Sequence, residues 1–389
     1  MKVALIGNMN NNHFAMMRYF HRLGVEAYLF KFSNEFDHFQ PECDTYEFEK
    51  WESYIIQTDI IDGDIKQYLR LKKTYLFNLF KGFDFYVGNG MSSAYLLKAG
   101  ISLDIFIPYC VGIEYTYRVE KKNVFDYFKE KIVALIQENA IKKNVKIVCA
   151  ADDTTFKKSN SLGKKTLPYT IPMVYNLEDL SNVNTNVSVD KIVEKIKSYD
   201  FTVFSHVSHV SHKSEIYKIK RNDILINSFA EYIKQNPEHN SVLILLEYGS
   251  DLKYSKDLII ELAIESYVIW LPLMMRKELL LVLEHVSIGC GELGGYFWGG
   301  TGWEFLSMGK LFIWSVGMDK NKLSEMINTP LPNFVNSNDV KEISNFFNYY
   351  YHNKVELEKL GIENKIWFNK YGGIELARKY IDLFNNLEY

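Results

Sequence analysis

The sequence predicts an α/β fold made of two doubly wound domains, and three observations support this prediction. The chain has 389 residues, a length that suggests two domains. Short apolar runs alternate with helical patterns from end to end, which is typical of parallel sheets covered by helices. A polar stretch, residues 176–197, separates two such series and is predicted to be a linker.

We therefore expect an N-terminal domain over residues 1–185 and a C-terminal domain over residues 198–370. Doubly wound sheets bind ligands at the carboxyl ends of their strands, so the expected site is a central cleft that both domains face. The final helical segment, residues 373–389, follows the break Tyr371-Gly372-Gly373. It is expected to pack back on the first domain.

The individual elements are predicted from apolar runs and from periodicity. In the first domain the expected strands are residues 3–6, 27–30, 85–87, 105–108 and 146–150. In the second they are residues 202–205, 242–247, 268–271, 286–289 and 311–315. Helical periodicity is clearest over residues 223–235, 256–263 and 276–284.

The composition narrows the class of protein. Hydrophobic residues make up 47% of the chain and charged residues 24%, as in ordinary globular proteins. The net charge of −3 argues against a nucleic-acid binder. The cysteines are widely spaced, which argues against zinc ribbons and disulfide scaffolds and fits a reducing compartment. No signal peptide or membrane-spanning run is recognised, so a cytoplasmic protein is expected.

A glycine-rich turn, Gly299-Gly300-Thr301-Gly302, leads into a short helix that carries Glu304 near its start. Glycines let a ligand approach the backbone, and helix N-termini attract phosphate. A carboxylate one turn later can accept hydrogen bonds from sugar hydroxyls, so the pattern indicates a nucleotide site. The alternative is a capping box, in which Thr301 and Glu304 satisfy N–H groups of the helix start.

The order of segments over residues 201–315 resembles the donor-binding domain of retaining GT-B glycosyltransferases, family 4. Lys220-Arg221-Asn222-Asp223 resembles the K-G-x-D element of that family. Residues 268–272 resemble its V-x-F-x-G strand and turn, and residues 300–310 its G-x-x-x-x-E-A-M-A-x-G-K signature. In the first domain, the loop 7–13 and the turn 108–114 resemble family members more weakly.

The resemblance implies a GT-B fold of two Rossmann-like domains and a transferase that moves a sugar from a nucleotide-sugar to a glycan or lipid-linked acceptor with retention. Cell-surface polysaccharide synthesis is the expected context, the N-terminal domain would bind the acceptor, and no metal cofactor is expected. In this interpretation Glu304 binds the ribose, and the turn before it binds the phosphates. Leu271 lies near the base. Lys220 is the first candidate to carry the leaving-group charge, with Arg221 second, and His212 or Lys213 lies near the diphosphate.

The sugar-binding half of the site is less well matched. The family often has a second glutamate eight residues before the conserved one, where this chain has Tyr296. Glu292 is the nearest upstream carboxylate and is the candidate for that role. His13, in the loop after the first strand, and Glu114 are candidates to contact the donor sugar or the acceptor. The alternatives are that Lys220 is a solvated charge and that the asparagine-rich loop 8–13 only forms a turn.

Two further features have competing interpretations. His206, His209 and His212 are spaced by three residues, but no cysteine or carboxylate cluster accompanies them, so no metal site is predicted. Residues 66–81 combine five basic residues with interleaved aromatic ones, which fits a peripheral contact with the inner face of the membrane. A helix with a solvated basic face is the alternative.

Two other functions stay open at this stage. A nucleotide-sugar epimerase could have the same two-domain fold and would act on one sugar nucleotide without an acceptor. A subunit that kept the fold and lost the chemistry is the other, because Tyr296 stands where the family has a carboxylate.

Overall fold

The structure is a computed structural model that describes residues 1–109, 112–116, 124–150, 152–169, 174–181, 183, 187–211, 220–295 and 299–387. The chain divides into two compact units. Unit 1 comprises Met1–Tyr175, Ser324–Pro330 and Tyr371–Tyr389, and unit 2 comprises Asn176–Leu323 and Leu331–Lys370.

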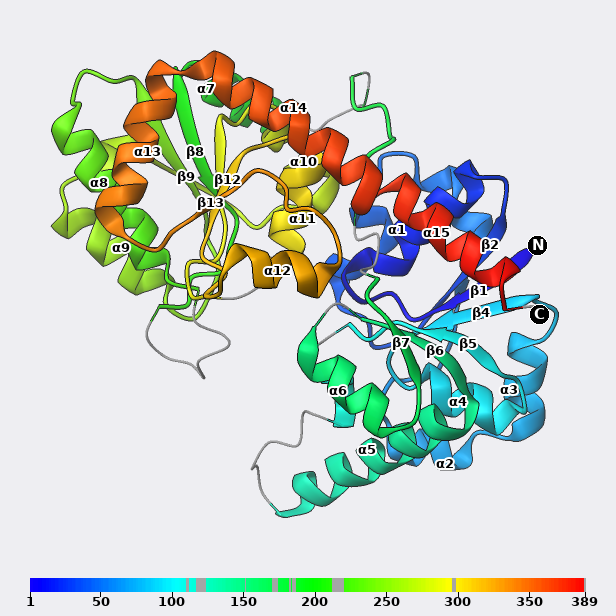
Figure 1. Ribbon diagram of the computed structural model, residues 1–389. Coiled ribbons are helices and arrows are strands. Elements are labelled where there is room, and N and C mark those ends of the chain that lie inside the picture. Colours follow the sequence, from blue (N-terminus) through cyan, green and yellow to red (C-terminus); the bar gives the residue numbers. More distant parts are fainter. Residues whose placement is uncertain are drawn as a thin grey trace. The chain divides into compact units, whose positions relative to one another are not determined.

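Unit 1 contains a seven-stranded parallel sheet in the order β3-β2-β1-β4-β5-β6-β7 (Figure 1). Its strands are β1 (Lys2–Ile6), β2 (Glu26–Lys31), β3 (Ile55–Gln57), β4 (Phe85–Gly88), β5 (Leu103–Phe106), β6 (Val145–Cys149) and β7 (Lys165–Leu167). Its helices are α1 (Asn12–Arg22), α2 (Ile65–Arg70), α3 (Lys73–Phe80), α4 (Ser92–Ala99), α5 (Val124–Asn144), α6 (Asp153–Ser161) and α15 (Ile374–Asn385).

Alternation along the strands of unit 1 gives each face of the sheet its own core. Val3 and Leu5 face the apolar cluster that includes α1 and α15, whereas Ala4 and Ile6 face the cluster built with α3, α4 and α5. The C-terminal helix α15 belongs to the first of these cores. The ring of Phe384 stacks on Phe85 with centroids 4.8 Å apart.

Unit 2 contains a six-stranded parallel sheet in the order β10-β9-β8-β11-β12-β13. Its strands are β8 (Phe201–Ser205), β9 (Ser241–Leu246), β10 (Val268–Leu271), β11 (Ile288–Cys290), β12 (Phe312–Trp314) and β13 (Val335–Asn336). The helices of this part of the chain are α7 (Val187–Lys197), α8 (Asn222–Gln235), α9 (Leu252–Glu261), α10 (Arg276–Glu284), α11 (Gly300–Ser307), α12 (Lys320–Ile327), α13 (Val340–His352) and α14 (Lys354–Tyr371).

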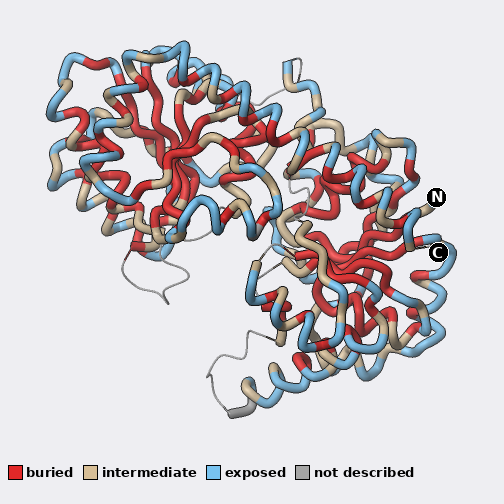
Figure 2. Tube along the Cα trace, in the orientation of Figure 1, coloured by how far each residue is buried: buried red, intermediate tan, exposed pale blue. Residues whose placement is uncertain are grey.

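The two faces of the second sheet are likewise covered by helices, and its strands are buried throughout most of their length (Figure 2). Ile313 of β12 belongs to the core shared with α8 and α13. Its neighbour Phe312 points to the other face, where its ring stacks on Phe305 of α11 with centroids 5.9 Å apart. This contact anchors α11 beneath the carboxyl edge of the sheet.

The predicted α/β fold is confirmed, and every predicted strand overlaps an observed one. The strands that were not predicted, β3, β7 and β13, are short and lie at sheet edges, where partial exposure weakens the apolar signal. The prediction that residues 176–197 are only a linker was wrong, because they contain α7. Val189 and Ile196, seven residues apart, bury one face of this helix, which packs near α10.

Both sheets reverse their strand order once, and this determines where ligands are expected. In unit 1 the reversal lies between β1 and β4, and in unit 2 between β8 and β11. Crevices form at the carboxyl ends of the strands on either side of such a reversal.

Among the described residues, no helix is both long enough and apolar enough to span a membrane.

Candidate functional site

The candidate site lies in unit 2, at the carboxyl ends of β8 and β11. β8 ends at Ser205 and leads directly to His206, and β11 ends at Cys290 and leads to Gly291 and Glu292. Gly291 has to be glycine because an added Cβ would lie 1.9 Å from the ring of Trp314 on β12. The loop after β11 therefore lies flat on the neighbouring strand.

The start of α11 is open on the side where a ligand would approach. Its N-cap is Gly299, which makes no side-chain capping bond, and Gly300 is the first helical residue. Among the described residues, which exclude 296–298, a Cβ added at Gly299 would meet nothing within 4 Å, and one at Gly300 would meet a terminal nitrogen of Arg276 at 4.0 Å. Neither residue has a positive φ. Packing and backbone conformation leave these glycines unexplained, whereas close approach of a ligand would explain them.

The capping-box interpretation of this segment was wrong. Thr301 is the second residue of α11 rather than its N-cap, so the spacing of a capping box is shifted. The carboxylate of Glu304 does not turn back to the helix start. It binds two side chains from other segments of the chain.

Glu304 is the centre of a buried ionic network. Oε1 accepts a hydrogen bond from Nε of Arg276 at 2.7 Å, and Oε2 lies 2.6 Å from Nε2 of His206. The exposed fraction of the side chain is 13% for Arg276, 7% for Glu304 and 5% for His206. Burial alone would raise the pKa of Glu304, but the charge of Arg276 and the bond with His206 outweigh it and lower this pKa to about 2.

His206 is held from several sides. Its ring packs against those of Phe204 and Phe305, with centroids 5.4 Å and 5.0 Å away, and its carbonyl oxygen accepts a hydrogen bond from the Tyr248 hydroxyl at 2.6 Å. The other ring nitrogen, Nδ1, is buried without a hydrogen-bond partner in the structure.

His206 and His209, the described histidines of the histidine-rich segment, have different partners. Nδ1 of His209 lies 2.8 Å from the Ser255 hydroxyl, its ring packs near Trp270, and burial lowers its pKa to about 4. His212 lies outside the described residues, as do Lys213 and Tyr296. Within the described part of the chain, no group of three or more His, Cys, Asp or Glu side chains could hold a metal ion.

Lys220 and Glu292, two of the predicted site residues, form an ion pair. The amide of Leu293 donates to the carbonyl of Lys220 at 3.0 Å and ties the two loops together. Burial, and then the charges of Glu304 and Glu292, raise the pKa of Tyr248. The structure thus pairs Lys220 with Glu292, while the Tyr248 hydroxyl binds the carbonyl of His206, the partner of Glu304.

Two other predicted residues lie at the margin of this cluster. Arg221 is the N-cap of α8 with a φ of 58°, and its guanidinium binds Asp223 in the first turn of the same helix at 2.9 Å. Leu271 ends β10 and is buried, and its carbonyl accepts from the amide of Glu247 at 2.8 Å.

His13 and Glu114 belong to unit 1. Nδ1 of His13 lies 2.6 Å from the Gly7 carbonyl, Nε2 is buried without a partner, and burial lowers the pKa of the ring to about 4. Glu114 is fully buried and has a φ of 48°. It accepts hydrogen bonds from the Tyr109 amide and from Gln137, and burial raises its pKa to about 8.

The side chains of Asn8 and Asn11 in the asparagine-rich loop hold the turn itself, as the alternative interpretation of this loop predicts. The amide group of Asn8 donates to Asn11 Oδ1 at 2.7 Å and to the Phe39 carbonyl at 3.0 Å. Its oxygen accepts from the Phe14 amide at 3.0 Å, at the start of α1. These side chains hold the loop that presents His13.

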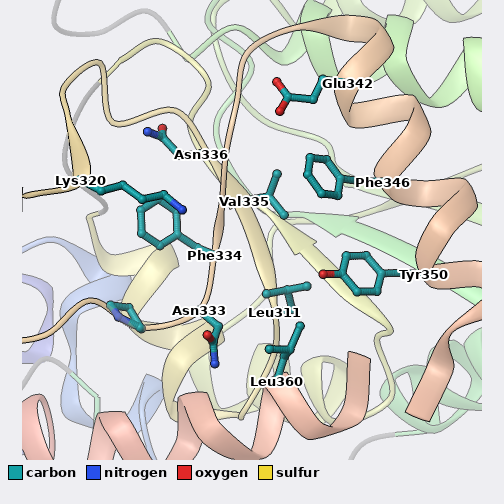
Figure 3. Close-up of a pocket in the computed structure, with 11 residues that line it drawn as sticks. Leu311, Lys320, Asn333, Phe334, Val335, Asn336, Glu342, Phe346, Tyr350 and Leu360 are labelled. Carbon is teal, nitrogen blue, oxygen red and sulfur yellow. The ribbon is translucent and has the colours of Figure 1, made fainter. Parts of the chain in front are cut away.

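A separate cavity of about 370 Å³ lies beside the edge strand β13 (Figure 3). Lys320 lies over the ring of Phe334 at 5.1 Å on one side, and Glu342 lies on another. No residue predicted for the site lines this cavity. Glu342 is engaged by the Ser337 hydroxyl at 2.6 Å, and its amide is capped by Asp339. The cavity is therefore distinct from the cluster at α11.

Sequence reasoning did not identify Arg276 and His206 as the partners of Glu304. Arg276 opens α10 and was predicted only as a helix boundary. His206 was considered only as a member of a histidine series. A possible signal was the lone arginine at a helix start that follows a strand of the candidate domain.

Comparisons with known proteins place this geometry in context. No protein-family description and no curated protein sequence matches the chain. Solved structures do match over nearly the whole length. Anabaena HepE, solved with UDP, is 12% identical with a TM-score of 0.61, and the match covers 99% of this chain and 100% of HepE. The chain has the GT-B fold.

Other structures support the same conclusion. The UDP-GlcNAc 2-epimerase of Neisseria meningitidis, solved with UDP-GlcNAc, is 12% identical with a TM-score of 0.59, over 99% of this chain and all of the epimerase. The sucrose-phosphate synthase of Thermosynechococcus elongatus is 12% identical with a TM-score of 0.57, over 100% of this chain and 99% of the synthase. At these identities the similarity establishes the fold, and the function has to be argued from the site.

Proposed function

We propose that the protein is a glycosyltransferase that takes a sugar from a nucleotide-sugar and transfers it, with retention, to a glycan or lipid-linked acceptor. One observation carries the proposal. Within the described part of the chain, neither packing nor a positive φ requires glycine at Gly299 and Gly300, and the Arg276 side chain lies near Gly300. A helix start with open amides and an adjacent cation suits a diphosphate. Similar structures solved with UDP, UDP-glucose and UDP-GlcNAc agree with this ligand class.

The proposed reaction exchanges one bond at the anomeric carbon. The bond to the diphosphate oxygen breaks, the acceptor hydroxyl oxygen bonds to the same carbon on the same face, and the hydroxyl proton passes to the diphosphate. The protein has to stabilise the charge that grows on the leaving group and to hold the reactants in place. Lys220 and the amides of Gly300 and Thr301 would stabilise that charge. Glu292 pairs with this lysine just after β11, and in the proposal it would contact the sugar.

The test has two stages. Thermal-shift measurements with UDP-, GDP-, CMP- and dTDP-sugars identify the donor, since a ligand at 100 times its dissociation constant stabilises by about 2.7 kcal/mol. Product analysis by proton NMR then reports the anomeric configuration. A retained configuration, with activity that survives EDTA, is expected. An inverted product, or activity restored only by Mn²⁺ or Mg²⁺, would contradict the proposal.

Metal independence is part of the proposal and has a structural argument. The sequence contains an Asp-x-Asp element, Asp62-Gly63-Asp64. Asp64 is the N-cap of α2, and Asp62 accepts hydrogen bonds from the Met91 amide and the Tyr115 hydroxyl, each at 2.8 Å. Asp152 and Asp153 form an adjacent carboxylate pair. Asp152 is the N-cap of α6, where its Oδ1 accepts from the Thr155 amide at 2.8 Å. A carboxylate used to cap a helix is a poor choice for a metal ligand. Lys220 and Arg276 would supply positive charge instead.

An epimerase is a second candidate, and Glu114 is the observation that favours it. With a pKa of about 8 this buried carboxyl is protonated at neutral pH, as a proton donor requires. An epimerase breaks and re-forms a C–H bond of its sugar. Incubation of UDP-GlcNAc in D₂O without acceptor decides between the two. Deuterium in the sugar ring would favour the epimerase. Transfer to an added acceptor without deuterium in the ring would favour the transferase.

The lipid-linked acceptor is a further part of the proposal. The basic segment 66–81 folds as α2 and α3 with a break between them. Its lysines and Arg70 are all exposed, and so are Leu69 and Phe77, at 68% and 45%. This combination fits the surface of an anionic membrane. Sedimentation with phosphatidylglycerol vesicles, but not with phosphatidylcholine vesicles, is expected. Equal sedimentation with both, or with neither, would exclude an electrostatic contact.

A further inference from the structure

The outer face of α5 carries apolar side chains that lie outside the core of unit 1. The helix packs on that core through residues such as Val133 and Ile141, which belong to the same buried cluster as α3 and α4. Phe128, Ile132 and Leu135 recur at the spacing of one helical face, and each is at least 47% exposed. Single exposed apolar residues are common on protein surfaces, but three along one helical face indicate a contact surface.

The exposed charged residues of the same helix are basic over most of its length. The structure describes every residue from 128 to 143, and both glutamates in this range are only partly exposed. One of them, Glu138, pairs with Lys142 and with Lys158 of α6, each at 3.1 Å. The exposed charged residues in this range are Lys129, Lys131, Lys142 and Lys143. The outer face of α5 therefore combines apolar side chains with lysines.

The acidic residues near the start of the helix lie to one side of this face. Asp126, in the first turn, and Glu130 line a cavity of about 320 Å³ together with Tyr115 and Lys129. They contribute to the wall of that cavity, whereas Phe128, Ile132 and Leu135 do not line it.

The same combination of side chains continues on the neighbouring helix. α2 contacts α5 at the periphery of unit 1 (Figure 1). The pKa of Asp64, the N-cap of α2, is lowered mainly by the hydrogen bond from the Gln67 amide and to a smaller extent by the charge of Lys129. On α2 itself, Leu69 and Arg70 are exposed. The two helices thus both expose apolar and basic side chains.

α14 is a useful comparison, because it also exposes an apolar stripe. Val355, Ile362 and Ile366 are each at least 62% exposed. The exposed charged residues between them have both signs and are Glu356, Glu358, Lys359, Glu363 and Lys365. A protein partner can complement charges of both signs, whereas an anionic lipid surface attracts a face of positive charge only. The sign of the charges therefore distinguishes α5 from α14.

We propose that α5 inserts Phe128, Ile132 and Leu135 into the interface of an anionic lipid bilayer, while its exposed lysines bind the lipid head groups. Amphipathic helices with a basic polar side bind membranes in this way. The inference rests on the lipid-linked acceptor of the proposed function for its purpose, which is to bring unit 1 to an acceptor in the membrane. α5 supplies the apolar part of the contact, and residues 66–81 add positive charge.

The first test measures sedimentation of the whole protein with phosphatidylglycerol vesicles. The triple variant Phe128→Gln, Ile132→Gln, Leu135→Gln should bind these vesicles about tenfold less tightly or weaker, because burial of three apolar side chains is lost. The substituted residues are exposed, so the variant should melt at the wild-type temperature.

A matched variant controls for the loss of exposed apolar surface as such. Val355→Gln, Ile362→Gln, Ile366→Gln removes the same number of exposed apolar side chains from α14. It should bind phosphatidylglycerol vesicles as the wild type does.

The second test detects insertion directly. Tryptophan fluorescence of Ile132→Trp should be quenched by phosphatidylglycerol vesicles with brominated acyl chains, beyond any quenching of the wild type. Ile362→Trp on α14 is the control and should show no additional quenching. A contact made by charge alone would leave both variants without additional quenching and would contradict insertion.

The remaining outcomes separate this inference from its alternatives. An α5 triple variant that binds vesicles like the wild type would overturn it and leave the membrane contact to residues 66–81. The same variant, if it loses self-association in sedimentation velocity and keeps vesicle binding, would identify the α5 face as a contact between copies of this chain.

The inference and the proposed function can fail separately, because vesicle binding is measured without donor or acceptor. Wild-type protein that binds phosphatidylglycerol vesicles but transfers no sugar would refute the proposed function alone. Wild-type protein that transfers sugar to a soluble acceptor but does not bind these vesicles would refute the membrane role of α5 alone.

Discussion

Two helical glycines, Gly300 and Gly361, give opposite predictions for the same substitution. Gly300 is the first residue of α11, and among the described residues a Cβ there would meet the Arg276 guanidinium at 4.0 Å. Gly361 lies inside α14, and its Cβ would stand 2.2 Å from the carbonyl oxygen of Gly309. Gly309 follows α11 at its far end. The two substitutions therefore test the open end of α11 and its packed end.

The magnitudes follow from these distances. Gly→Ala in a compatible conformation stabilises by about 0.4–1 kcal/mol, so Gly300→Ala should raise the melting temperature by about 1–4 °C. Gly361→Ala forces backbone atoms apart and should cost about 1–3 kcal/mol, which lowers the melting temperature by several degrees. Calorimetric or fluorescence melting of the two variants and the wild type measures both changes.

Ligand binding should change in the opposite order. A methyl group at Gly300 would lie where a phosphate oxygen approaches the amides, and loss of one charge-assisted bond costs about 1.5–3 kcal/mol. Gly300→Ala should therefore weaken UDP by about tenfold or more, while Gly361→Ala binds within a few-fold of wild type. An unchanged UDP affinity in Gly300→Ala would refute the assignment of the α11 start as the phosphate site.

Three further predictions concern charged residues. The folded-state pKa of Glu304, about 2, lies below the usual 4.5, so its ionised form stabilises the fold above pH 4.5, and about 3 kcal/mol of this stability is lost as the pH falls toward 2. The free energy of urea unfolding of Glu304→Gln should therefore depend less on pH than that of the wild type. The same pH dependence in both proteins would contradict this. The raised pKa of Glu114, about 8, costs up to about 5 kcal/mol as the pH rises from 4.5 to 8, so Glu114→Gln should gain stability relative to wild type at pH 9 compared with pH 5. No relative gain would mean that this carboxyl ionises normally. Lys220→Met should weaken UDP by about tenfold or more and leave Glu292 without its cation; wild-type affinity in this variant would remove Lys220 from the site.

Much of the fold could be predicted because its signals are local. A buried strand such as β9 is a continuous apolar run, and α10 was predicted with its observed bounds because its apolar residues recur at helical spacing. The edge strand β13 has two residues and lies at the border of the sheet, so its sequence carries little apolar signal. α7 was missed because its polar residues outnumber the few that it buries.

The candidate site divides in the same way. The glycines at the start of α11, and Lys220 and Glu292 as separate candidates, were within reach of the sequence, since each stands near the end of a recognisable strand or the start of a recognisable helix. Their pairing was not predicted and is seen only in the structure. Arg221 stays a predicted candidate for the leaving-group charge, and its salt bridge with Asp223 in the first turn of α8 could be seen only in the structure. The capping-box interpretation failed because the helix begins two residues before its spacing requires.

The sequence by itself determined the fold class and the open helix start at Gly299 and Gly300, because strand hydrophobicity and glycine placement act over a few neighbouring residues. Only the tertiary structure decided what Glu304 does. Its partners, Arg276 and His206, come from segments far apart in the chain, and they meet because parallel strands deliver their carboxyl ends to one edge of the sheet. A buried carboxylate has to find a partner, and the choice of partner belongs to the folded chain.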